Sequence, residues 1–226
     1  MELFHLHTKG IKDNNWVEGK VINVDDKFTN RLGERVNNYN TCVAGNNHPE
    51  LYNSHKFLYE SNGIYVGENV ELCDLISHYL FLINNGEHIQ RNVTIKLLEE
   101  ASKILHDSRI FKREKAMEEY RQINTPENPS RLHSVFLCNE SDLDYWSSNL
   151  LDNDLDVFKV EVDNTPFASS EEFFTDVDLS YKETIDSLYS YWHPNLKKVK
   201  NYPIEYLATG KILLKEKVSE IKRNNN

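Results

Sequence analysis

The chain has 226 residues, enough for one domain with a large insertion or for two small domains. Hydrophobic residues make up 39% of the chain and aromatic residues 11%, which is ample material for a core and argues against a disordered chain. The net charge of −10 argues against a protein that holds nucleic acid by bulk charge, although it does not exclude a local basic groove.

The positions of the cysteines and the hydropathy of the sequence indicate the cellular compartment of the protein. Cys42, Cys73 and Cys138 lie far apart without a CxxC pair, which indicates neither a disulfide framework nor a zinc ribbon. The first residues lack the basic start and apolar core of a signal peptide, and no window reaches the length of a membrane span. We therefore expect a soluble, cytoplasmic protein with no membrane partner.

The N-terminal part is predicted to consist of two strands followed by loops. In the first strand, residues 2–8, alternation places His5 and His7 on one face. Such a pair is most often structural, and a metal site would need further ligands that the sequence does not place. A short strand is predicted at residues 21–24. The Asn-rich residues 25–55 are predicted to be long loops, which are often binding loops.

Residues 70–122 have the spacing of apolar side chains that is typical of helices. We expect three helices there, with Gly86 separating the first from the second. The charges at residues 113–119 are predicted to form a solvated face. Because the segment lacks strands between its helices, it is interpreted as a helical insertion at about residues 70–125.

A strand–helix–strand unit at residues 129–163 is the part around which the chain is organised. Its two strands are predicted at residues 131–138 and 157–162. Asn139 or Ser141 would cap the short helix between them. This helix carries Tyr145 and Trp146 near a sheet edge, where they would form a wall for a flat ring.

The last part is predicted to contain a loop, a helix and two extended segments, at residues 166–178, 180–192, 202–208 and 211–218. Ser180 is the predicted cap of the helix, with Glu183 at the capping-box position. Glu205 lies inside the apolar strand. A carboxylate there is either paired and merely tolerated, or it is the reason that the strand exists.

Common templates for catalytic and nucleotide sites are missing from the sequence. It contains no Walker loop, no GxGxxG and no GxSxG, and its eight glycines are scattered. Nucleotide binding through a glycine-rich turn is therefore excluded. A Cys–His pair built on Cys138 has no support beyond composition.

Three motifs follow one another in an order that resembles a known superfamily. They are Leu3-Phe4-His5, then Ser134-Val135-Phe136-Leu137 with Tyr145-Trp146 on the next helix, and finally Ile204-Glu205-Tyr206-Leu207. Together they resemble the ADP-ribosyltransferases of the histidine–tyrosine–glutamate branch, which includes poly(ADP-ribose) polymerases, rifamycin ADP-ribosyltransferases and bacterial toxins. Two further stretches, Pro129-Ser130-Arg131-Leu132 and Tyr191-Trp192, are similar to an uncharacterised bacterial branch of this fold.

The resemblance implies an α+β fold with a split, mixed β-sheet core of the ADP-ribosyltransferase type, in one domain over residues 1–226. It also implies NAD as the substrate whose nicotinamide–ribose bond is cleaved. Glu205 would hold a ribose hydroxyl and offset the charge of an oxocarbenium-like state. His5 would fix a ribose hydroxyl or the adenosine side, and Tyr145 would stack on nicotinamide.

Further residues are assigned to NAD by the same resemblance. Besides His5 and Tyr145, they are Arg131, Ser134 and Phe136. Arg131, and less directly Arg31 with Asn30, would lie near the diphosphate. The structural alternative for Arg131 is pairing with an acid. Val135 stands where many members carry tyrosine, so one hydroxyl of the family's site would be either missing or supplied by Ser134.

Three functions remain open. The first is an NAD-dependent mono-ADP-ribosyltransferase that modifies a protein or nucleic acid, as a bacterial toxin or phage-defence effector with an expected antitoxin partner. The second is a transferase of the rifamycin type, which a buried apolar pocket would favour, whereas an open basic cleft would favour a nucleic-acid acceptor. The third is a non-catalytic interaction module, in which a buried cation would pair with Glu205 and side chains would fill the cleft.

Overall fold

The computed structural model describes residues 2–9, 16–43, 72–89, 91–150, 154–173, 181–200 and 202–222. The chain divides into two compact units. The sheet unit comprises Met1–Glu34 with Arg113–Asn226, and the helical unit comprises Arg35–Lys112. The predicted insertion at residues 70–125 thus falls partly in each unit, because its last residues belong to the sheet unit.

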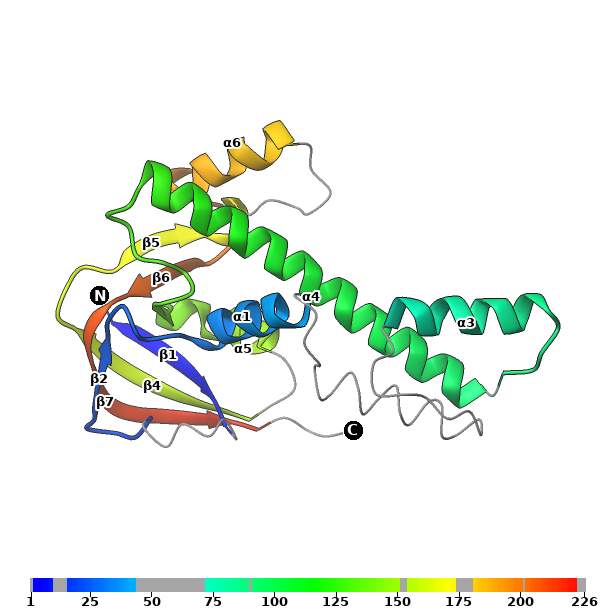
Figure 1. Ribbon diagram of the computed structural model, residues 1–226. Helices are drawn as coiled ribbons and strands as arrows, with labels where there is room; N and C mark the ends of the chain where they lie inside the picture. The colour runs from blue at the N-terminus through cyan, green and yellow to red at the C-terminus, as the bar shows by residue number, and fades with distance from the viewer. Residues whose placement is uncertain are drawn as a thin grey trace. The chain divides into compact units, whose positions relative to one another are not determined.

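The described part of the sheet unit contains two antiparallel sheets (Figure 1). The four-stranded sheet has the order β1 (Leu3–Thr8), β4 (Leu155–Val162), β7 (Gly210–Ile221) and β2 (Val21–Val24). The three-stranded sheet has the order β3 (Val135–Leu137), β6 (Ile204–Ala208) and β5 (Phe167–Ser170). An α+β architecture is confirmed. The expected mixed sheet is wrong, since every strand pairing in the described residues is antiparallel.

The described helices are α1 (Arg31–Val43), α3 (Leu72–Asn84), α4 (Arg91–Asn124), α5 (Leu143–Asn149) and α6 (Tyr181–Trp192). Three short 3₁₀-helices accompany them, at Glu140–Asp142, Glu171–Phe173 and Leu196–Lys198. No helix within the described residues combines the length and the apolarity that a membrane crossing needs.

The main core lies between the two sheets. Leu3, Phe158 and Ile212 from the four-stranded sheet share one buried cluster with Val135 and Tyr206 from the three-stranded sheet. Side chains alternate along β6, so Tyr206 and Ala208 enter this core while Glu205 and Leu207 point to the opposite face. We call the first side of the three-stranded sheet its core face and the second its helix face.

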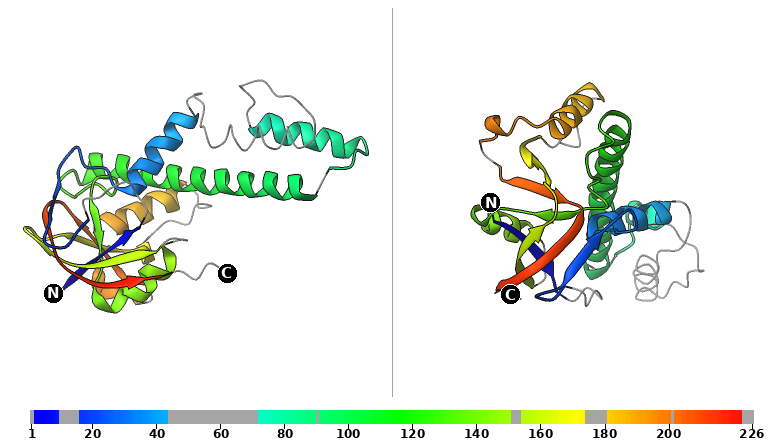
Figure 2. Two further views of the ribbon diagram at one scale, coloured as in Figure 1. Left: turned by 90° about the horizontal axis from the view of Figure 1, so that it is seen from below. Right: turned by 90° about the vertical axis from the view of Figure 1, so that its left-hand side faces the viewer.

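Helices cover the helix face. Met117 of α4 packs with Leu188 and Trp192 of α6 and with Leu207 of β6, and the Trp192 indole donates a hydrogen bond to the Met117 carbonyl at 3.1 Å. Figure 2 shows from two further sides that α6 lies beside the last turns of α4. A polar side chain on this face, such as Glu205, is therefore enclosed by two helices.

The chain passes from one sheet to the other at Gly210. It leaves β6, adopts a φ of 80° at Gly210 and continues as β7 in the four-stranded sheet. A Cβ atom there would lie 2.6 Å from Oδ1 of Asp163. Both the positive φ and this close approach therefore require glycine at this position. The predicted turn at residues 209–210 thus joins two sheets.

The prediction of loops at residues 25–55 is wrong for the described part, because α1 begins at Arg31. Asn30 caps this helix, since its Oδ1 accepts a hydrogen bond from the Gly33 amide at 2.8 Å. The Asn-rich composition of this stretch predicts loops, so the helix was missed. The first turn of α1 packs closely on the 129–134 loop, since a Cβ on Gly33 would lie 2.6 Å from the Leu132 carbonyl oxygen.

Two further predictions need correction. The expected second and third helices are one continuous 34-residue helix, α4, because the charged residues between them are good helix formers. The predicted loop at residues 166–178 contains β5. The sequence of this strand shows no strand pattern, and its extended conformation comes from pairing with β6. The expected cap Ser180 lies outside the described residues.

Other predicted elements are confirmed within two residues at their ends. These are the strands at residues 2–8, 21–24, 157–162 and 202–208 and the helix at residues 180–192. The strand predicted at residues 131–138 is shorter, because residues 131–134 belong to a loop. Neither predicted cap forms, because Asn139 makes no side-chain cap bond and Ser141 lies inside the 3₁₀-helix before α5, whose N-cap residue is Asp142.

Candidate functional site

Four side chains from four different segments meet on the helix face, and we call them the buried ionic cluster. They are Glu114 of α4, Arg131 of the loop before β3, Tyr191 of α6 and Glu205 of β6. Their exposed fractions are 1%, 5%, 0% and 2%. Ionised groups are rarely buried unless they are paired, so their interactions decide what the cluster can do.

Arg131 holds the cluster together. Its Nε donates to Oε2 of Glu114 at 3.0 Å, and its Nη1 donates to the Tyr191 hydroxyl at 2.6 Å. The same Nη1 forms an ion pair with Oε1 of Glu205, to which the Tyr191 hydroxyl also donates. One guanidinium therefore serves two carboxylates and a phenol.

Aromatic rings and a second cation complete the surroundings of Arg131. Its guanidinium carbon lies 5.1 Å from the ring centre of Phe136 and 5.1 Å from that of Tyr191, within the range of cation–π contacts. Arg113 approaches Glu114 from the other side, with its Nε at 2.9 Å and its Nη2 at 2.7 Å from Oε1. The two guanidiniums balance the two carboxylates.

The two carboxyl groups respond differently to this environment. Burial opposes ionisation of Glu114, but the guanidiniums of Arg131 and Arg113 outweigh it and lower its pKa. Burial raises the pKa of Glu205, and the opposing effects of Arg131 and of the Tyr191 hydrogen bond do not cancel it. Glu205 is thus the carboxyl of the cluster that binds a proton more readily.

The backbone around Arg131 is fixed by Asn30 from the start of α1. Its Nδ2 donates to the carbonyl oxygens of Arg131 at 2.6 Å and Ser134 at 2.7 Å. The Ser134 hydroxyl donates to the Ser130 carbonyl at 2.6 Å, inside the same loop. Asn30 and Ser134, which were predicted near NAD, therefore brace the loop that presents Arg131. Arg31 donates to the Thr8 hydroxyl at 3.2 Å.

His5 lies on the core side of the sheet unit. Its Nδ1 donates to the Phe136 carbonyl at 3.0 Å, and the Trp16 ring stacks on it at 4.2 Å between ring centres. Burial lowers the pKa of His5 to about 4, only partly opposed by that hydrogen bond. The imidazole is therefore neutral at pH 7, with its hydrogen on Nδ1 and an acceptor at Nε2.

Tyr145 stands on α5 near the edge of the three-stranded sheet. Its hydroxyl donates to Oε2 of Glu171 at 2.7 Å, and its ring meets Trp146 edge-on at 5.3 Å between centres. Burial, helped by the hydrogen bond to Glu171, raises the pKa of Tyr145 to about 12. Tyr145 is thus a hydrogen-bond donor in the physiological range.

The structure brings together some of the predicted site residues. Arg131, Phe136 and Glu205 meet in the buried ionic cluster. His5 lies on the core side and Tyr145 at the sheet edge. Among the described residues, no interaction of His5, Tyr145 or Glu205 joins any two of these three.

Sequence reasoning missed two members of the cluster. Glu114 was assigned to a solvated face, which is wrong for this residue because it lies against Arg131. Its neighbours Lys115 and Glu119 do form an exposed pair at 3.9 Å. Tyr191 was named only as part of the Tyr191-Trp192 stretch that is similar to a bacterial branch of the fold, and no role was predicted for it. An acid directly after Arg113 in a helix gives no local sign of burial, so the sequence held no signal for Glu114.

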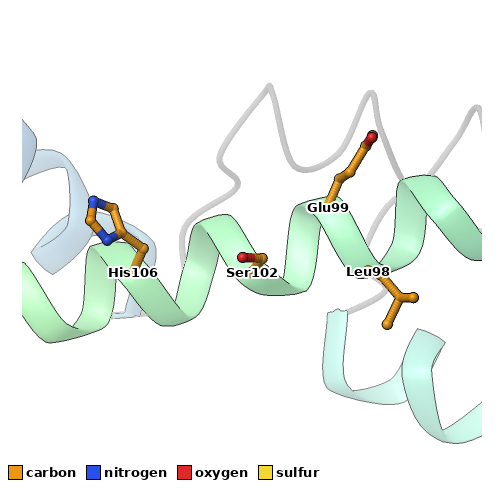
Figure 3. A pocket seen from close by; sticks show the side chains of 4 residues that line it. All are labelled: Leu98, Glu99, Ser102 and His106. Carbon is orange, nitrogen blue, oxygen red and sulfur yellow. The ribbon is translucent and has the colours of Figure 1, made fainter. Parts of the chain in front are cut away.

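A surface hollow lies in the helical unit. Leu98, Glu99, Ser102 and His106 line it, all from successive turns of α4 (Figure 3). All four side chains are exposed. The hollow contains no residue of the buried ionic cluster, and a single exposed helix face offers no enclosed volume for a ligand.

Comparison with known proteins gives a family. The family model described as "Protein of unknown function (DUF2441)" matches residues 3–220. The matched range spans both units and includes all described strands except the last residue of β7. No curated protein matches the chain.

Proposed function

The chain belongs to the DUF2441 family, and we propose that it is an NAD-dependent ADP-ribosyltransferase. The observation that carries the proposal is Glu205, a carboxyl that is 2% exposed in an otherwise apolar strand and whose pKa is raised by burial. A carboxyl that is costly to bury and whose pKa is shifted by its surroundings is a candidate for chemistry. The motifs that resemble ADP-ribosyltransferases place their glutamate at this position.

The proposed reaction breaks the bond between nicotinamide and C1′ of ribose. Nicotinamide departs with the bonding electrons, an acceptor nucleophile forms the new bond to C1′, and the acceptor releases a proton. Glu205, as a carboxylate, would bind a ribose hydroxyl and stabilise the positive charge on the sugar. Arg131, already beside Glu205, has the donors to bind a phosphate oxygen of the diphosphate.

Access is the main requirement of this proposal. The helix face around Glu205 is filled by the side chains of Arg131, Tyr191 and Phe136. NAD can reach Glu205 only if Arg131 gives up one of its carboxylate partners and the covering helices separate from the sheet. His5 and Tyr145 keep their proposed roles toward the adenosine side and the nicotinamide, although the described contacts do not join them to Glu205.

The proposed acceptor is a macromolecule, either a protein or a nucleic acid, in a toxin or phage-defence role with an antitoxin partner. This rests on the resemblance alone. A small-molecule acceptor of the rifamycin type is the alternative within the same chemistry. Separate digestion of proteins and nucleic acids after the reaction tells these classes apart.

A non-catalytic interaction module is the second candidate, and one observation favours it. Arg131 pairs with Glu205 as a buried cation, and aromatic side chains fill the space around them. In this interpretation the cluster clamps α4 and α6 onto the sheet and fixes their register. Buried ion pairs serve such specificity in some proteins while adding little net stability.

The test incubates a lysate with the protein and isotope-labelled NAD, and follows free nicotinamide and label on each polymer class. Glu205→Gln keeps the shape of the side chain and removes its charge. Glu114→Gln does the same to the other, equally buried carboxyl of the cluster and is the matched control. The transferase proposal expects a loss on the order of 100-fold or more in Glu205→Gln alone.

The outcomes separate the two candidates. Label on one polymer class that depends on Glu205 supports a transferase and identifies the acceptor class. If the folded wild-type protein neither releases nicotinamide nor transfers label to any fraction, the transferase proposal fails and the non-catalytic module stands. Equal activity of both variants and the wild type would also remove Glu205 from the chemistry.

A further inference from the structure

A stack of three aromatic rings lies on the core side of β1, away from the buried ionic cluster. His5 and His7 point to the same side of the strand, with 6.0 Å between their ring centres. Trp16 covers both of them, at 4.2 Å and 25° to His5 and at 4.9 Å and 20° to His7. A single indole therefore lies nearly parallel to two imidazoles.

The shape of this contact indicates what else could occupy it. An indole is a fused six- and five-membered ring, and a purine has the same outline. The two imidazole planes are inclined at 41° to each other, and together they form an aromatic surface of the size that an adenine ring covers. Bases of nucleotides commonly stack on aromatic side chains, including histidine.

The two layers of the stack are held differently. The imidazoles belong to β1, which pairs along its full length with β4 and places His5 opposite Phe158. His5 is further fixed by its hydrogen bond to the Phe136 carbonyl. Trp16 comes from the connection between β1 and β2, is half-buried, and has no hydrogen bond to its indole nitrogen among the described residues. Strand pairing and a hydrogen bond hold the imidazoles, whereas the interactions of the Trp16 side chain among the described residues are stacking and packing against the core.

The electrostatics also suit a neutral ring. At pH 7 the His5 imidazole is uncharged, and its Nε2 keeps an acceptor lone pair. This lone pair lies in the plane of the imidazole, so a base stacked on the face of His5 does not use it. An uncharged imidazole can be covered by a neutral base without the cost of taking a charge out of water.

We propose that His5 and His7 form a platform for the adenine ring of a nucleotide, and that Trp16 occupies this platform until the nucleotide displaces it. The proposal rests on the proposed function in one respect, because NAD is the nucleotide that it names. It adds a binding site for the adenine end and a residue, Trp16, that competes with the ligand for that site.

The first test observes Trp16 directly. The chain has three tryptophans, so protein labelled with 5-fluorotryptophan gives three fluorine NMR signals, and Trp16→Phe identifies that of Trp16. The probes are NAD, adenosine 5′-monophosphate, nicotinamide mononucleotide and ribose 5-phosphate. We expect NAD and adenosine 5′-monophosphate to shift the Trp16 signal, and the two probes without adenine to leave it unchanged.

The second test measures affinity. If Trp16 competes with adenine, Trp16→Ala removes the competitor and tightens binding of adenosine 5′-monophosphate by roughly 2- to 12-fold, the value of one aromatic contact. Trp16→Phe should tighten it less and keeps more of the packing. Tyr189→Ala is the matched control, since Tyr189 stacks on His193 at 4.5 Å elsewhere on the surface. It should leave the affinity unchanged.

The results distinguish this proposal from the proposed function. A Trp16 signal that no adenine probe shifts, a shift by nicotinamide mononucleotide alone, or weaker binding by Trp16→Ala overturns the platform. Release of nicotinamide that depends on Glu205 but leaves Trp16 unaffected keeps the transferase and rejects the platform. A Trp16 response to adenosine 5′-monophosphate without any NAD turnover keeps the platform and rejects the transferase.

Discussion

Glu114 and Glu205 bind the same guanidinium, that of Arg131, inside the sheet unit. One carboxyl comes from a helix and the other from a strand, and each is at most 2% exposed. The shared cation lowers the pKa of Glu114 but leaves that of Glu205 raised. This inequality makes Glu205 the more easily protonated member of the pair, and it leads to predictions that need no knowledge of the substrate.

Arg131→Met should strongly destabilise the fold. It leaves two buried carboxyl groups without their common cation, a change that typically costs about 3–5 kcal/mol. Urea denaturation at pH 7 measures the difference in free energy of unfolding. Lys115→Met breaks the exposed pair with Glu119 and should cost less than about 0.5 kcal/mol. A loss below about 1 kcal/mol for Arg131→Met would show that the cluster is not an ion-paired unit.

Glu114→Gln should destabilise the protein more than Glu205→Gln. The environment favours the charged form of Glu114, so neutralising it removes favourable interactions with Arg131 and Arg113. The environment disfavours the charged form of Glu205, so neutralising that side chain removes less favourable interaction energy. We expect the two variants to differ by roughly 1–3 kcal/mol in unfolding free energy at pH 7. Equal losses, or the reverse order, would contradict the assigned directions of the two pKa shifts.

His5 should make the protein less stable as the pH falls from about 6.5 to about 4. In the unfolded chain the imidazole binds a proton near its ordinary pKa of 6.5, whereas in the folded protein its pKa is about 4. Acidification through this window therefore favours the unfolded state, by roughly 1–3 kcal/mol in total.

His5→Gln should flatten the dependence of unfolding free energy on pH between 4 and 6.5 relative to the wild type. Chemical denaturation at several pH values gives both slopes, and the comparison cancels groups that titrate in both proteins. His193→Gln, at an exposed histidine, serves as the control. Wild-type and His5→Gln curves that run parallel through this range would argue against a half-buried, neutral His5.

Asn30→Ala should cost roughly 2–4 kcal/mol of stability. It removes the cap of α1 and two hydrogen bonds to the loop that presents Arg131. Asn30→Ser keeps a capping oxygen without the two donors, so thermal or urea unfolding of both variants separates the cap from the loop bonds. If Asn30→Ser is as stable as the wild type, the bonds to Arg131 and Ser134 do not contribute.

Local pattern was enough for much of the secondary structure. Alternation of apolar residues located β1, β2, β4 and β6, and helical spacing located α6. Such periodicity reports which face of an element is buried, and it needs no knowledge of what covers that face. It did not locate β5, a four-residue strand whose order comes from pairing with β6.

The candidate site, too, could be predicted only in part from the sequence. The pattern around Glu205 identifies a carboxylate in an apolar strand, which must be either paired or functional. Folding brings Arg131 to it, adds Glu114 and Tyr191, and places His5 on the core side instead. A charged side chain can be buried only where partners from distant segments neutralise it. The residues next to Glu114 in the sequence do not indicate that a loop and a strand will supply those partners.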